Sequence, residues 1–408
     1  MTETGSRRRL VEQVVLAAVT EHAELSRTEI ARVTGIPRAT VIGAVAALLA
    51  DGCLVEAGPD AVSGRRGRPA TRLRLPPEPG LVAVADSSQG VVRLALVTPD
   101  GEVSAAAERR YDWLSPGPEW VAECGCLDEV PAVLRMYDEL TAVVAEPVRA
   151  GAIGVWGPFR PGRGWEDGCT GTRPSPPRRT EGPPRIAVPR HDPAPALAQA
   201  WGFEVRSERG PVLRAMGEAT AGAAIGAETM LYLQVAEVLA AAIVVEGRPF
   251  HGAGGMAGEL THITLGDAGQ PCFCGRRGCL GATVGVGYLV DTLRPALGAV
   301  GIEDVLVLAA EEDRSVRRAF DQAGRQLGQA LANSLALLDA DLVVIDADLD
   351  AAGQMVAEAF AETVALAYPV GSMHLPRVRV GALPGTSYAV GGAALFRQQR
   401  VPSRGLTR

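Results

Sequence analysis

The first fifty residues carry the apolar spacing of three short helices. Apolar residues over 10–19 recur every three or four positions, which predicts the first helix. Ser26 and Glu29 have the spacing of a capping box, in which each side chain accepts the backbone N–H of the other residue, so a second helix begins there. Gly35 permits a turn, and one apolar face over 37–51 predicts a third helix. Helix, turn and helix in this order predict a helix-turn-helix motif.

Two strand-like segments, 53–57 and 71–75, predict the winged form of this motif. Between them lies a basic, glycine-containing stretch, since residues 61–75 hold five arginines and no acidic residue. Guanidinium groups on a flexible turn suit DNA phosphates or a narrow minor groove. The predicted DNA contacts are Arg65, Arg66 and Arg68 in the wing, and Arg38 and Thr40 at the start of the third helix.

An alternative for this region is a protein–protein module, because three-helix folds also serve that purpose. The start of the third helix is poor in side chains that read bases, since Ala39, Ile42 and Gly43 stand beside Arg38 and Thr40. Sequence specificity is therefore expected to be modest or to reside largely in the wing.

A proline-rich break, Pro76–Gly80, separates this region from the rest of the chain. Beyond it, strands and helices alternate in two successive groups, which predicts an α/β body with two lobes. The expected domains are 1–78, 79–195 and 196–408, and residues 159–190, rich in Pro, Gly and Arg, are expected to form a long surface loop. The expected strands are 81–86, 91–97, 102–106, 152–156, 230–235, 240–245, 342–345 and 377–382; the expected helices are 120–144, 196–201, 210–224, 289–297, 314–338, 353–367 and 389–397.

Composition adds limits to this picture. The 408 residues are 47% hydrophobic, enough to bury real cores, and the net charge of −7 implies no strong overall attraction to nucleic acid. The apolar runs are too short to span a membrane and the N-terminus lacks a signal-peptide core, so we expect a cytoplasmic protein. All 40 basic residues are arginine, so a lysine Schiff base or P-loop lysine is excluded.

One short stretch has the spacing of a metal site. His262, Cys272, Cys274 and Cys279 fall close together, and glycines at 275 and 278 permit a tight knuckle. Imidazole and thiolates are the ligands that tetrahedral zinc prefers. Cys124 and Cys126 have no third ligand near them in sequence and are expected to be ordinary thiols.

The winged helix-turn-helix, the basic wing, the segment Gly254–His262 and the Cys-x-Cys-x4-Cys knuckle together resemble the ROK family of sugar kinases and transcriptional regulators. The resemblance implies an actin-like (ribonuclease H-like) two-lobed body, with the final helix a candidate to return to lobe 1. It also implies binding of operator DNA, control by a sugar or sugar phosphate, and a homodimer or homotetramer.

The features that the family's kinases need are missing. Where the resemblance implies a phosphate turn of the type Asp-x-Gly-x-Thr, the chain has Asp86-Ser-Ser-Gln-Gly, so Asp86 is expected to be an ordinary strand-end turn residue. Glu237 stands in the expected second phosphate turn, where it would repel phosphate. The Asn-Asp pair that holds the sugar and removes its proton falls on Arg209-Gly210. Kinase activity is therefore not expected.

The same comparison alters the expected effector pocket. Glu259 and His262 are retained, whereas the glutamate expected two residues after the last cysteine is Gly281. The loss of acceptors for sugar hydroxyls favours a less hydroxylated ligand or an empty pocket. The expected effector-binding residues are Glu259 and Arg209, and Arg209 favours an acidic effector. With four protein ligands, the zinc is expected to be structural rather than catalytic.

The sequence thus predicts a ROK-type regulator that binds operator DNA and responds to a small effector. Two alternatives stay open: a diverged enzyme on the same scaffold, and a DNA binder that has lost effector control.

Overall fold

A computed structural model of the chain describes residues 3–22, 24–50, 53–59, 71–75, 80–88, 90–111, 128–157, 159, 161, 192–236, 239–264, 269–272, 276–368 and 374–398. Its internal contacts group Met1–Gly80 with Ala393–Arg408 in one unit and place Leu81–Gly392 in the other.

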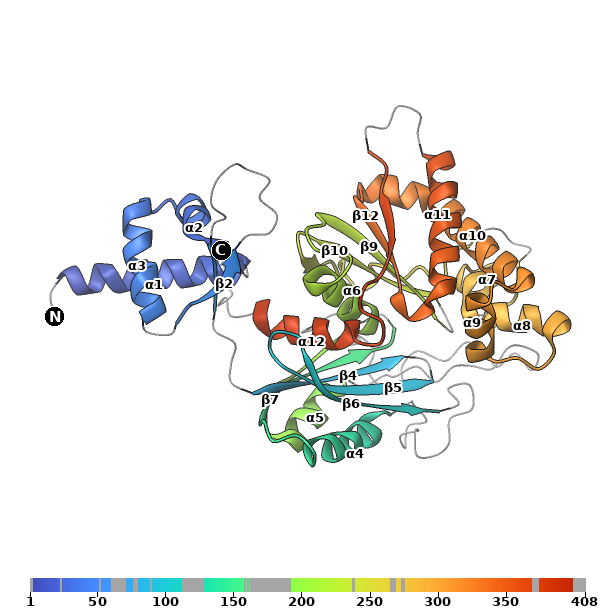
Figure 1. Ribbon diagram of the computed structural model, residues 1–408, viewed down its shortest axis with the longest axis horizontal. Coiled ribbons are helices and arrows are strands. Elements are labelled where there is room, and N and C mark those ends of the chain that lie inside the picture. The colour runs from blue at the N-terminus through green and yellow to red at the C-terminus, as the bar shows by residue number, and fades with distance from the viewer. Residues whose placement is uncertain are drawn as a thin grey trace. The chain divides into compact units, whose positions relative to one another are not determined.

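Three helices and a small antiparallel sheet form the N-terminal part of the first unit (Figure 1). The sheet has the order β1-β3-β2. Apolar side chains from all three helices and from β3 meet in one core, in which Val19, Ile30, Val45 and Leu73 are fully buried. The elements are α1 (Glu3–His22), β1 (Leu25–Ser26), α2 (Arg27–Thr34), α3 (Arg38–Ala50), β2 (Val55–Pro59) and β3 (Thr71–Arg74).

The boundaries of α2 follow the predicted signals. Ser26 Oγ accepts the Glu29 N–H at 3.3 Å and Glu29 Oε2 accepts the Ser26 N–H at 2.8 Å, which confirms the capping box. Gly35 ends the helix with a φ of 68°, in the left-handed region that favours glycine. The axes of α2 and α3 are bent by 120° relative to each other, an angle typical of a helix-turn-helix. Two of the three strands were predicted, and β1, only two residues long, was not.

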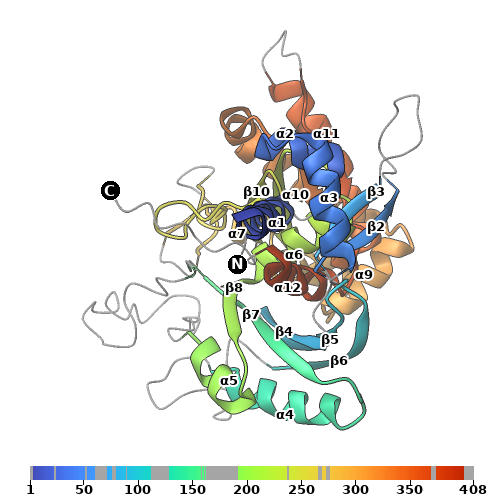
Figure 2. The same ribbon diagram turned by 90° about the vertical axis from the view of Figure 1, so that its left-hand side faces the viewer.

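The second unit begins with a five-stranded sheet of order β6-β5-β4-β7-β8. Strands β4, β5 and β6 form an antiparallel meander, whereas β4, β7 and β8 run parallel. Helices α4 and α5 pack on one face of this sheet, and α6 and the beginning of α12 lie over the other (Figures 1 and 2). The elements are β4 (Leu81–Ser88), β5 (Val91–Val97), β6 (Val103–Arg110), α4 (Val130–Thr141), β7 (Val148–Val155), α5 (Ala194–Trp201), β8 (Val205–Arg209), α6 (Gly210–Ala221) and α12 (Ser387–Gln398).

A second five-stranded sheet, of order β11-β10-β9-β12-β13, builds the other lobe. Helices α7 to α11 cover one of its faces with a large apolar core, and α6 packs on the opposite face. The elements are β9 (Thr229–Val235), β10 (Leu239–Val245), β11 (Arg248–Pro249), α7 (Gly281–Val284), α8 (Val286–Leu297), α9 (Ile302–Ala310), α10 (Arg314–Leu338), β12 (Leu342–Ile345), the short 3₁₀ helix η2 (Ala347–Leu349), α11 (Ala351–Ala367) and β13 (Arg377–Val380).

Helix α6 is the element that both sheets share, because it packs against β4 and β7 of the first and β9 and β10 of the second. It also crosses α12 at close range, since a Cβ at Gly217 would collide with the carbonyl oxygen of Ser387. Strand β8 pairs with β7, so the first sheet extends to Arg209, beyond the lobe boundary predicted at residue 195.

Most of the predicted strands and helices of the body are confirmed, and α10 begins and ends where the pattern placed it. Pro131 lies in the first turn of α4, as expected of a helix start within 120–144. Five elements were missed: α7, α9, β8, β11 and the short 3₁₀ helix η2. The sequence of α9 is apolar on nearly all sides, and β8 carries charged residues on both faces, so neither shows a one-sided pattern. The predicted loop over 159–190 lies almost entirely outside the described residues.

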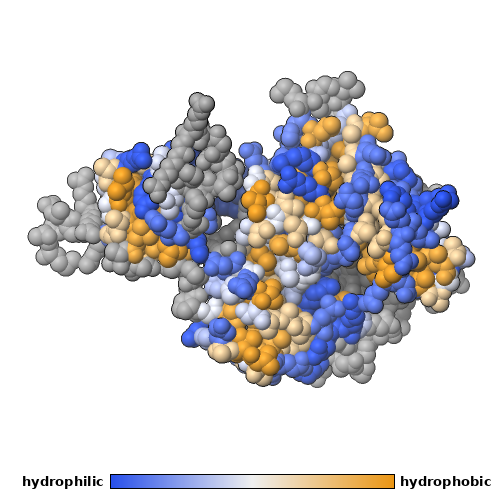
Figure 3. All heavy atoms as spheres, viewed as in Figure 1, coloured by the Kyte–Doolittle hydropathy of each residue, from blue (hydrophilic) through white to orange (hydrophobic). Residues whose placement is uncertain are grey.

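The surface shown in Figure 3 mixes hydrophilic and hydrophobic residues in small areas. The most exposed large apolar side chains are Leu337 in α10 and Leu366 in α11, at 88% and 89%. Isolated exposed leucines of this kind are common on folded proteins. Among the described residues no single helix is long and apolar enough to cross a membrane, and α2 and α3 reach that length only when joined across their bend.

Candidate functional site

The predicted DNA-contacting residues fall into two groups. Arg38 and Thr40 lie in the first turn of α3 and are exposed, whereas the next residue, Val41, is fully buried in the core. This burial pattern aims the start of α3 away from the core. Arg65, Arg66 and Arg68 lie outside the described residues, in the segment of chain that connects the antiparallel strands β2 and β3.

Three of the four predicted metal ligands come together. The ligand atoms of His262, Cys272 and Cys279 all lie within 4.8 Å of one another, and Cys272 Sγ is 3.6 Å from His262 Nδ1. Both cysteines are buried. Because two sulfurs and an imidazole nitrogen converge on one point, this cluster can hold a metal ion. Cys274, the fourth predicted ligand, lies outside the described residues.

Backbone hydrogen bonds hold this knuckle in place. The Cys272 N–H donates to the Arg276 carbonyl at 2.8 Å, and the Gly278 N–H donates to the Gln270 carbonyl at 3.0 Å. Gly278 has a φ of 70°, which favours glycine at that turn. Burial, together with the positive charge of Arg276, lowers the pKa of His262, so its imidazole is neutral and keeps the lone pair that a metal requires.

The two predicted effector residues lie together but bind each other. Arg209, at the end of β8, is only 2% exposed, and its guanidinium forms an ion pair with Glu259. The same group donates to the carbonyl oxygens of Ala257 at 2.5 Å and Ala241 at 3.3 Å. Arg209 is therefore not a free cation in an open pocket, because its charge and most of its donors are used within the protein.

Asp86 was expected to be an ordinary turn residue, and that expectation is wrong. It is fully buried at the end of β4 and pairs with Arg214, 2.8 Å from its Nη2. Its carboxylate lies between two glycines, since a Cβ at Gly154 or Gly210 would lie 2.5 Å or 2.7 Å from Asp86 Oδ1. Gly210 is thus needed at this position because any side chain there would collide with the buried carboxylate.

Arg214 joins the two lobes through a buried ion network. Its Nη2 binds Asp86 on the first sheet, and its Nη1 binds Asp348 Oδ2 at 2.9 Å, in the η2 segment that follows β12 of the second sheet. The guanidinium carbon also lies 5.8 Å from the centre of the Tyr388 ring, within range of a cation–π contact. With only 1% of its side chain exposed, Arg214 occupies the space between the lobes that an external cation would otherwise need.

The pKa values of this network are shifted because several aspartates surround a single buried arginine. Burial disfavours the charged guanidinium, but Asp86, Asp346 and Asp348 together hold the pKa of Arg214 well above its usual value. Burial raises the pKa of Asp346 to about 6, although Arg214 acts in the opposite direction. Burial alone would also raise the pKa of Asp348, but the charge of Arg214 and the N–H of Gly385 outweigh it and lower that pKa.

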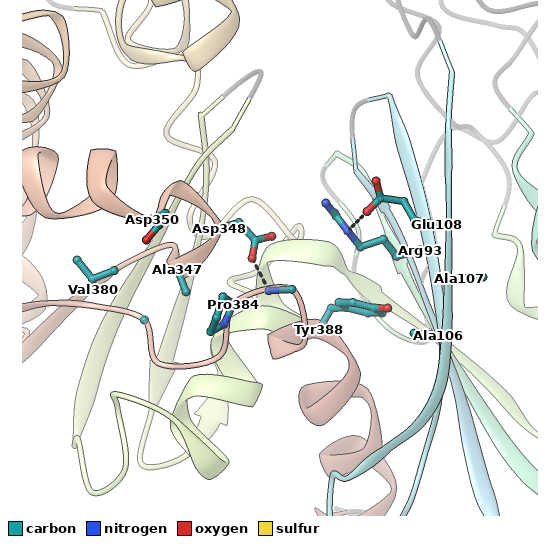
Figure 4. Close-up of a pocket in the computed structure, with 12 residues that line it drawn as sticks. Arg93, Ala106, Ala107, Glu108, Ala347, Asp348, Asp350, Val380, Pro384 and Tyr388 are labelled. Carbon is teal, nitrogen blue, oxygen red and sulfur yellow. Dashed lines mark hydrogen bonds and ion pairs between the residues drawn. The ribbon is translucent and has the colours of Figure 1, made fainter. Parts of the chain in front are cut away.

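Two cavities flank this network. A small one of about 10 Å³ lies beside Asp86, Gly210, Gln234 and Ala240, and it has room for about one water molecule. A much larger one, of about 760 Å³, lies on the other side and is bordered by Asp348 and Tyr388 (Figure 4). Little free space therefore lies beside Asp86 and Gly210, whereas a wide cavity lies next to the acidic turn that follows β12.

Arg214, Asp346 and Asp348 were not predicted as site residues. A signal was present, because Asp346, Asp348 and Asp350 follow the fully buried strand β12 at its carboxyl end, where parallel strands commonly present functional side chains. Arg214 carries no such signal, since it lies within a helix and its partners are 128 and 134 residues away in sequence.

Both a repressor and a sugar kinase are similar to the chain. The chain is 20% identical to the xylose repressor of Bacillus subtilis (strain 168) over 344 residues, which is 82% of this chain and 81% of the repressor. It is 31% identical to a glucokinase of Halalkalibacterium halodurans over 210 residues, which is 46% of this chain and 62% of that enzyme. The chain thus spans less than two thirds of the glucokinase.

Solved structures show the same fold. A crystal structure of a ROK family transcriptional regulator, a homolog of the E. coli MLC protein, matches 95% of this chain with a TM-score of 0.71 at 20% identity, and 96% of that regulator is covered. A ROK family glucokinase from Streptomyces griseus, in complex with glucose and AMPPNP, matches 78% of this chain with a TM-score of 0.62 at 19% identity, and 99% of that enzyme is covered. The ROK family pattern itself matches residues 178–399, more than half of the chain. The chain therefore belongs to the ROK family.

Proposed function

We propose that the chain is a ROK-type transcriptional regulator that binds operator DNA and has no sugar kinase activity. The observation that carries the proposal is the joining of a three-helix, winged N-terminal unit to a ROK body whose cleft is filled by its own arginines. The xylose repressor of B. subtilis aligns with most of the chain, which supports the regulator class.

DNA binding is assigned to the exposed start of α3 and to the wing. Arg38 and Thr40 would enter or border the major groove, while Arg65, Arg66 and Arg68 would contact phosphates or the minor groove. A homodimer or homotetramer would place two such units on a pair of half-sites. Because its target is operator DNA, the regulator would work in the cytoplasm.

The absence of kinase activity follows from what occupies the cleft. Phosphoryl transfer to a sugar requires a base for the hydroxyl proton and cradled phosphates with their metal. Asp86 is instead bound to Arg214, the base position is Gly210, and the adjoining cavity holds about 10 Å³. ATP-dependent phosphorylation of any sugar by the purified protein would overturn this part of the proposal, and it would favour the alternative of a diverged enzyme, which the partial likeness to a glucokinase keeps in view.

The metal cluster is assigned to structural zinc, with Cys274 as the fourth ligand beside His262, Cys272 and Cys279. Four protein ligands leave no coordination position for a substrate or water. The zinc would hold the knuckle that follows Glu259 and so fix the wall of the cleft. Effector binding by Glu259 and Arg209 remains a prediction, and it would require a ligand that breaks their ion pair.

Operator binding is tested with a DNA fragment selected from random sequence by the wild-type protein, with fluorescence anisotropy over a range of salt concentrations. A triple Arg65/Arg66/Arg68→Ala variant is expected to bind more weakly. Its slope of log affinity against log salt should fall by about 0.9 for each DNA phosphate that the variant no longer neutralises. A triple Arg294/Arg317/Arg318→Ala variant, altered on the body, serves as the matched control. Equal affinity and equal slope in the wing variant and the wild type would show that the wing does not bind DNA.

A further inference from the structure

A wide cavity lies between the first sheet and the acidic turn after β12. Its volume of about 760 Å³ is within the range of small-molecule sites. Figure 4 shows Asp348 and Asp350 on one side, Arg93 and Glu108 on the other, and Tyr388 between them. The cavity is therefore built by both lobes, and its polar groups stand on opposite walls.

The charges around this cavity are mainly negative. Three carboxylates and one guanidinium line it, a formal excess of two negative charges. Arg93 is already paired with Glu108, its Nε lying 2.9 Å from Glu108 Oε2. Asp348 shares Arg214 with Asp86, and Asp346 adds a further acid close behind. A single buried guanidinium therefore serves several carboxylates, and the cavity wall keeps a surplus of acceptors for a cationic donor.

Of the three carboxylates that line the cavity, Asp350 has the fewest hydrogen-bond and ion-pair partners. Its side chain makes no capping hydrogen bond to α11, and no hydrogen bond or ion pair joins that side chain to another described residue. By contrast, Asp348 accepts the Gly385 N–H on Oδ1 and Arg214 on Oδ2. Each carboxylate oxygen has two lone pairs, so Asp348 can still accept a further hydrogen bond. A ligand donor could therefore bind Asp348 and Asp350 together.

This arrangement argues against two classes of ligand. A phosphate or other anion would meet three carboxylates and only one, already paired, arginine. A bare divalent cation needs its oxygen ligands gathered around one point. Among the described residues, the group of metal-ligand atoms that converges in this way is the His262 cluster, not these acids.

We propose that this cavity binds a small organic amine that also carries several hydroxyl groups. The ammonium group would donate to Asp350 and to the remaining lone pairs of Asp348. The hydroxyl groups would donate to Glu108 and accept from Arg93 on the opposite wall. Aminated sugars and polyhydroxylated amines of similar size belong to this class, whereas sugar phosphates do not.

Ligand binding at Asp348 would reach the link between the lobes, because the same carboxylate holds Arg214. A cation placed against Asp348 competes with Arg214 for its negative charge, while Arg214 keeps Asp86. The proposed site thus adjoins the ion network at Asp348 and does not include the Arg209–Glu259 pair. This assignment deepens the proposed regulator by giving the chemistry of its effector, but the binding itself does not depend on operator recognition.

The test compares three probes that differ in charge but share one sugar ring: D-glucosamine, D-glucose and D-glucose 6-phosphate. Binding to the full chain is measured by isothermal titration calorimetry at pH 7 and low salt. The expected order of affinity is glucosamine above glucose, with glucose 6-phosphate weakest. Asp350→Asn is expected to weaken glucosamine binding about tenfold, the size of one charge-assisted hydrogen bond, and to leave glucose binding nearly unchanged.

Asp138→Asn is the matched control, because Asp138 is an exposed aspartate on α4 and does not line the cavity. Glucosamine should bind this variant as it binds the wild type. The proposal is overturned if none of the probes binds, if glucose 6-phosphate binds as tightly as glucosamine, or if Asp350→Asn and Asp138→Asn bind glucosamine equally. Operator affinity of the same preparations is measured separately, so a failure of DNA binding would count against the regulator and not against the amine site.

Discussion

The knuckle that carries His262, Cys272 and Cys279 differs from the interlobe cleft in how its grouped polar side chains are arranged. In the knuckle, two sulfurs and an imidazole nitrogen converge, and all three offer lone pairs to the same point. In the cleft, by contrast, Asp86, Asp348 and Glu259 each form an ion pair with an arginine of the chain itself. One region thus suits an external cation, and the other contains its own.

The difference shows that a side chain of the protein itself can take the place of an external ligand. Arg214 neutralises Asp86 and Asp348, and Arg209 neutralises Glu259, so acids that could have bound a metal or a hydroxylated substrate are already satisfied. The ligand atoms of His262, Cys272 and Cys279 instead lie within 4.8 Å of one another, close enough to share one metal ion. A cluster of ligand-type side chains therefore has to be judged together with the charged groups that the fold brings to it.

Removing the metal should have the largest effect and act on the knuckle alone. Structural zinc binds small domains with an apparent free energy of about 10–16 kcal/mol, so its loss should unfold the segment around Cys272 and Cys279. Elemental analysis should find about one zinc per wild-type chain and none in Cys272→Ser. The control Cys53→Ser alters an exposed cysteine outside the cluster and should keep the zinc. A wild-type protein purified without zinc would refute the contrast between the two regions.

Replacing Arg214 should be the next most damaging change. Arg214→Met leaves Asp86 and Asp348 without their cation, and breaking a buried pair from one side costs about 3–5 kcal/mol of unfolding free energy. Urea denaturation followed by fluorescence measures the loss. Arg294→Met, which removes an exposed ion pair with Asp291, should cost less than about 1 kcal/mol. If Asp86→Asn in the Arg214→Met background recovers none of the loss, the charge argument is wrong.

The titration of Asp346 gives a pH-dependent test of the same network. Its pKa is about 6 in the folded protein against an ordinary value of 3.8, so the folded state binds this proton more tightly. The resulting stabilisation is complete below about pH 4 and is lost as the pH rises through about 6. Relative to Asp346→Asn, the wild type should lose up to about 3 kcal/mol between pH 4 and pH 7.

Denaturation midpoints of both proteins, measured across that pH window, provide the comparison. Asp346→Asn keeps the shape of the side chain and an oxygen for the Asp348 N–H. Asp138→Asn, on the exposed surface of α4, should follow the wild type at every pH. A difference between wild type and Asp346→Asn that stays constant with pH would show that Asp346 does not titrate in this range.

Restoring the missing acid at residue 210 should have the smallest effect on stability and none on activity. In Gly210→Asp the new Cβ would lie 2.7 Å from Asp86 Oδ1, so we expect a loss of about 1–3 kcal/mol. The variant should still fail to phosphorylate glucose with ATP, because Arg214 continues to hold Asp86. Gly254→Asp, at a position where no atom lies within 4 Å of the added Cβ and the glycine has no positive φ, controls for the replacement of a glycine by aspartate. Kinase activity in Gly210→Asp would show that one missing base, and not the occupied cleft, explains the inactivity.

Much of the fold could be predicted because its signals are local. The capping box at Ser26, the glycine at residue 35 and the apolar stripe of α10 act within a few residues, and each element appears where it was expected. Strand β8 and helix α9 were missed because their place depends on neighbours. Strand β8 is stabilised by pairing with β7, and α9 by burial against the second lobe's core, rather than by a pattern of their own.

The candidate site divides along the same line. The cluster of candidate metal ligands could be predicted because His262, Cys272 and Cys279 lie close in sequence, so one tight knuckle brings them together. The sequence predicted Arg209 and Glu259 as effector-binding residues, but it did not predict that the two form an ion pair with each other. It gave Asp86 the wrong role, since a buried aspartate and a turn aspartate look alike until the partner is known.

By itself, then, the sequence determined the winged helix-turn-helix, the alternating body and the metal knuckle, because short-range spacing controls each of them. Only the tertiary structure decided what fills the cleft. Arg214 reaches Asp86 across 128 residues and Asp348 across 134, and that meeting depends on how the two sheets stack on α6. Whether a charge is free or neutralised is set by which side chains lie within about 4 Å, and that distance is a property of the packed lobes and not of the order of residues.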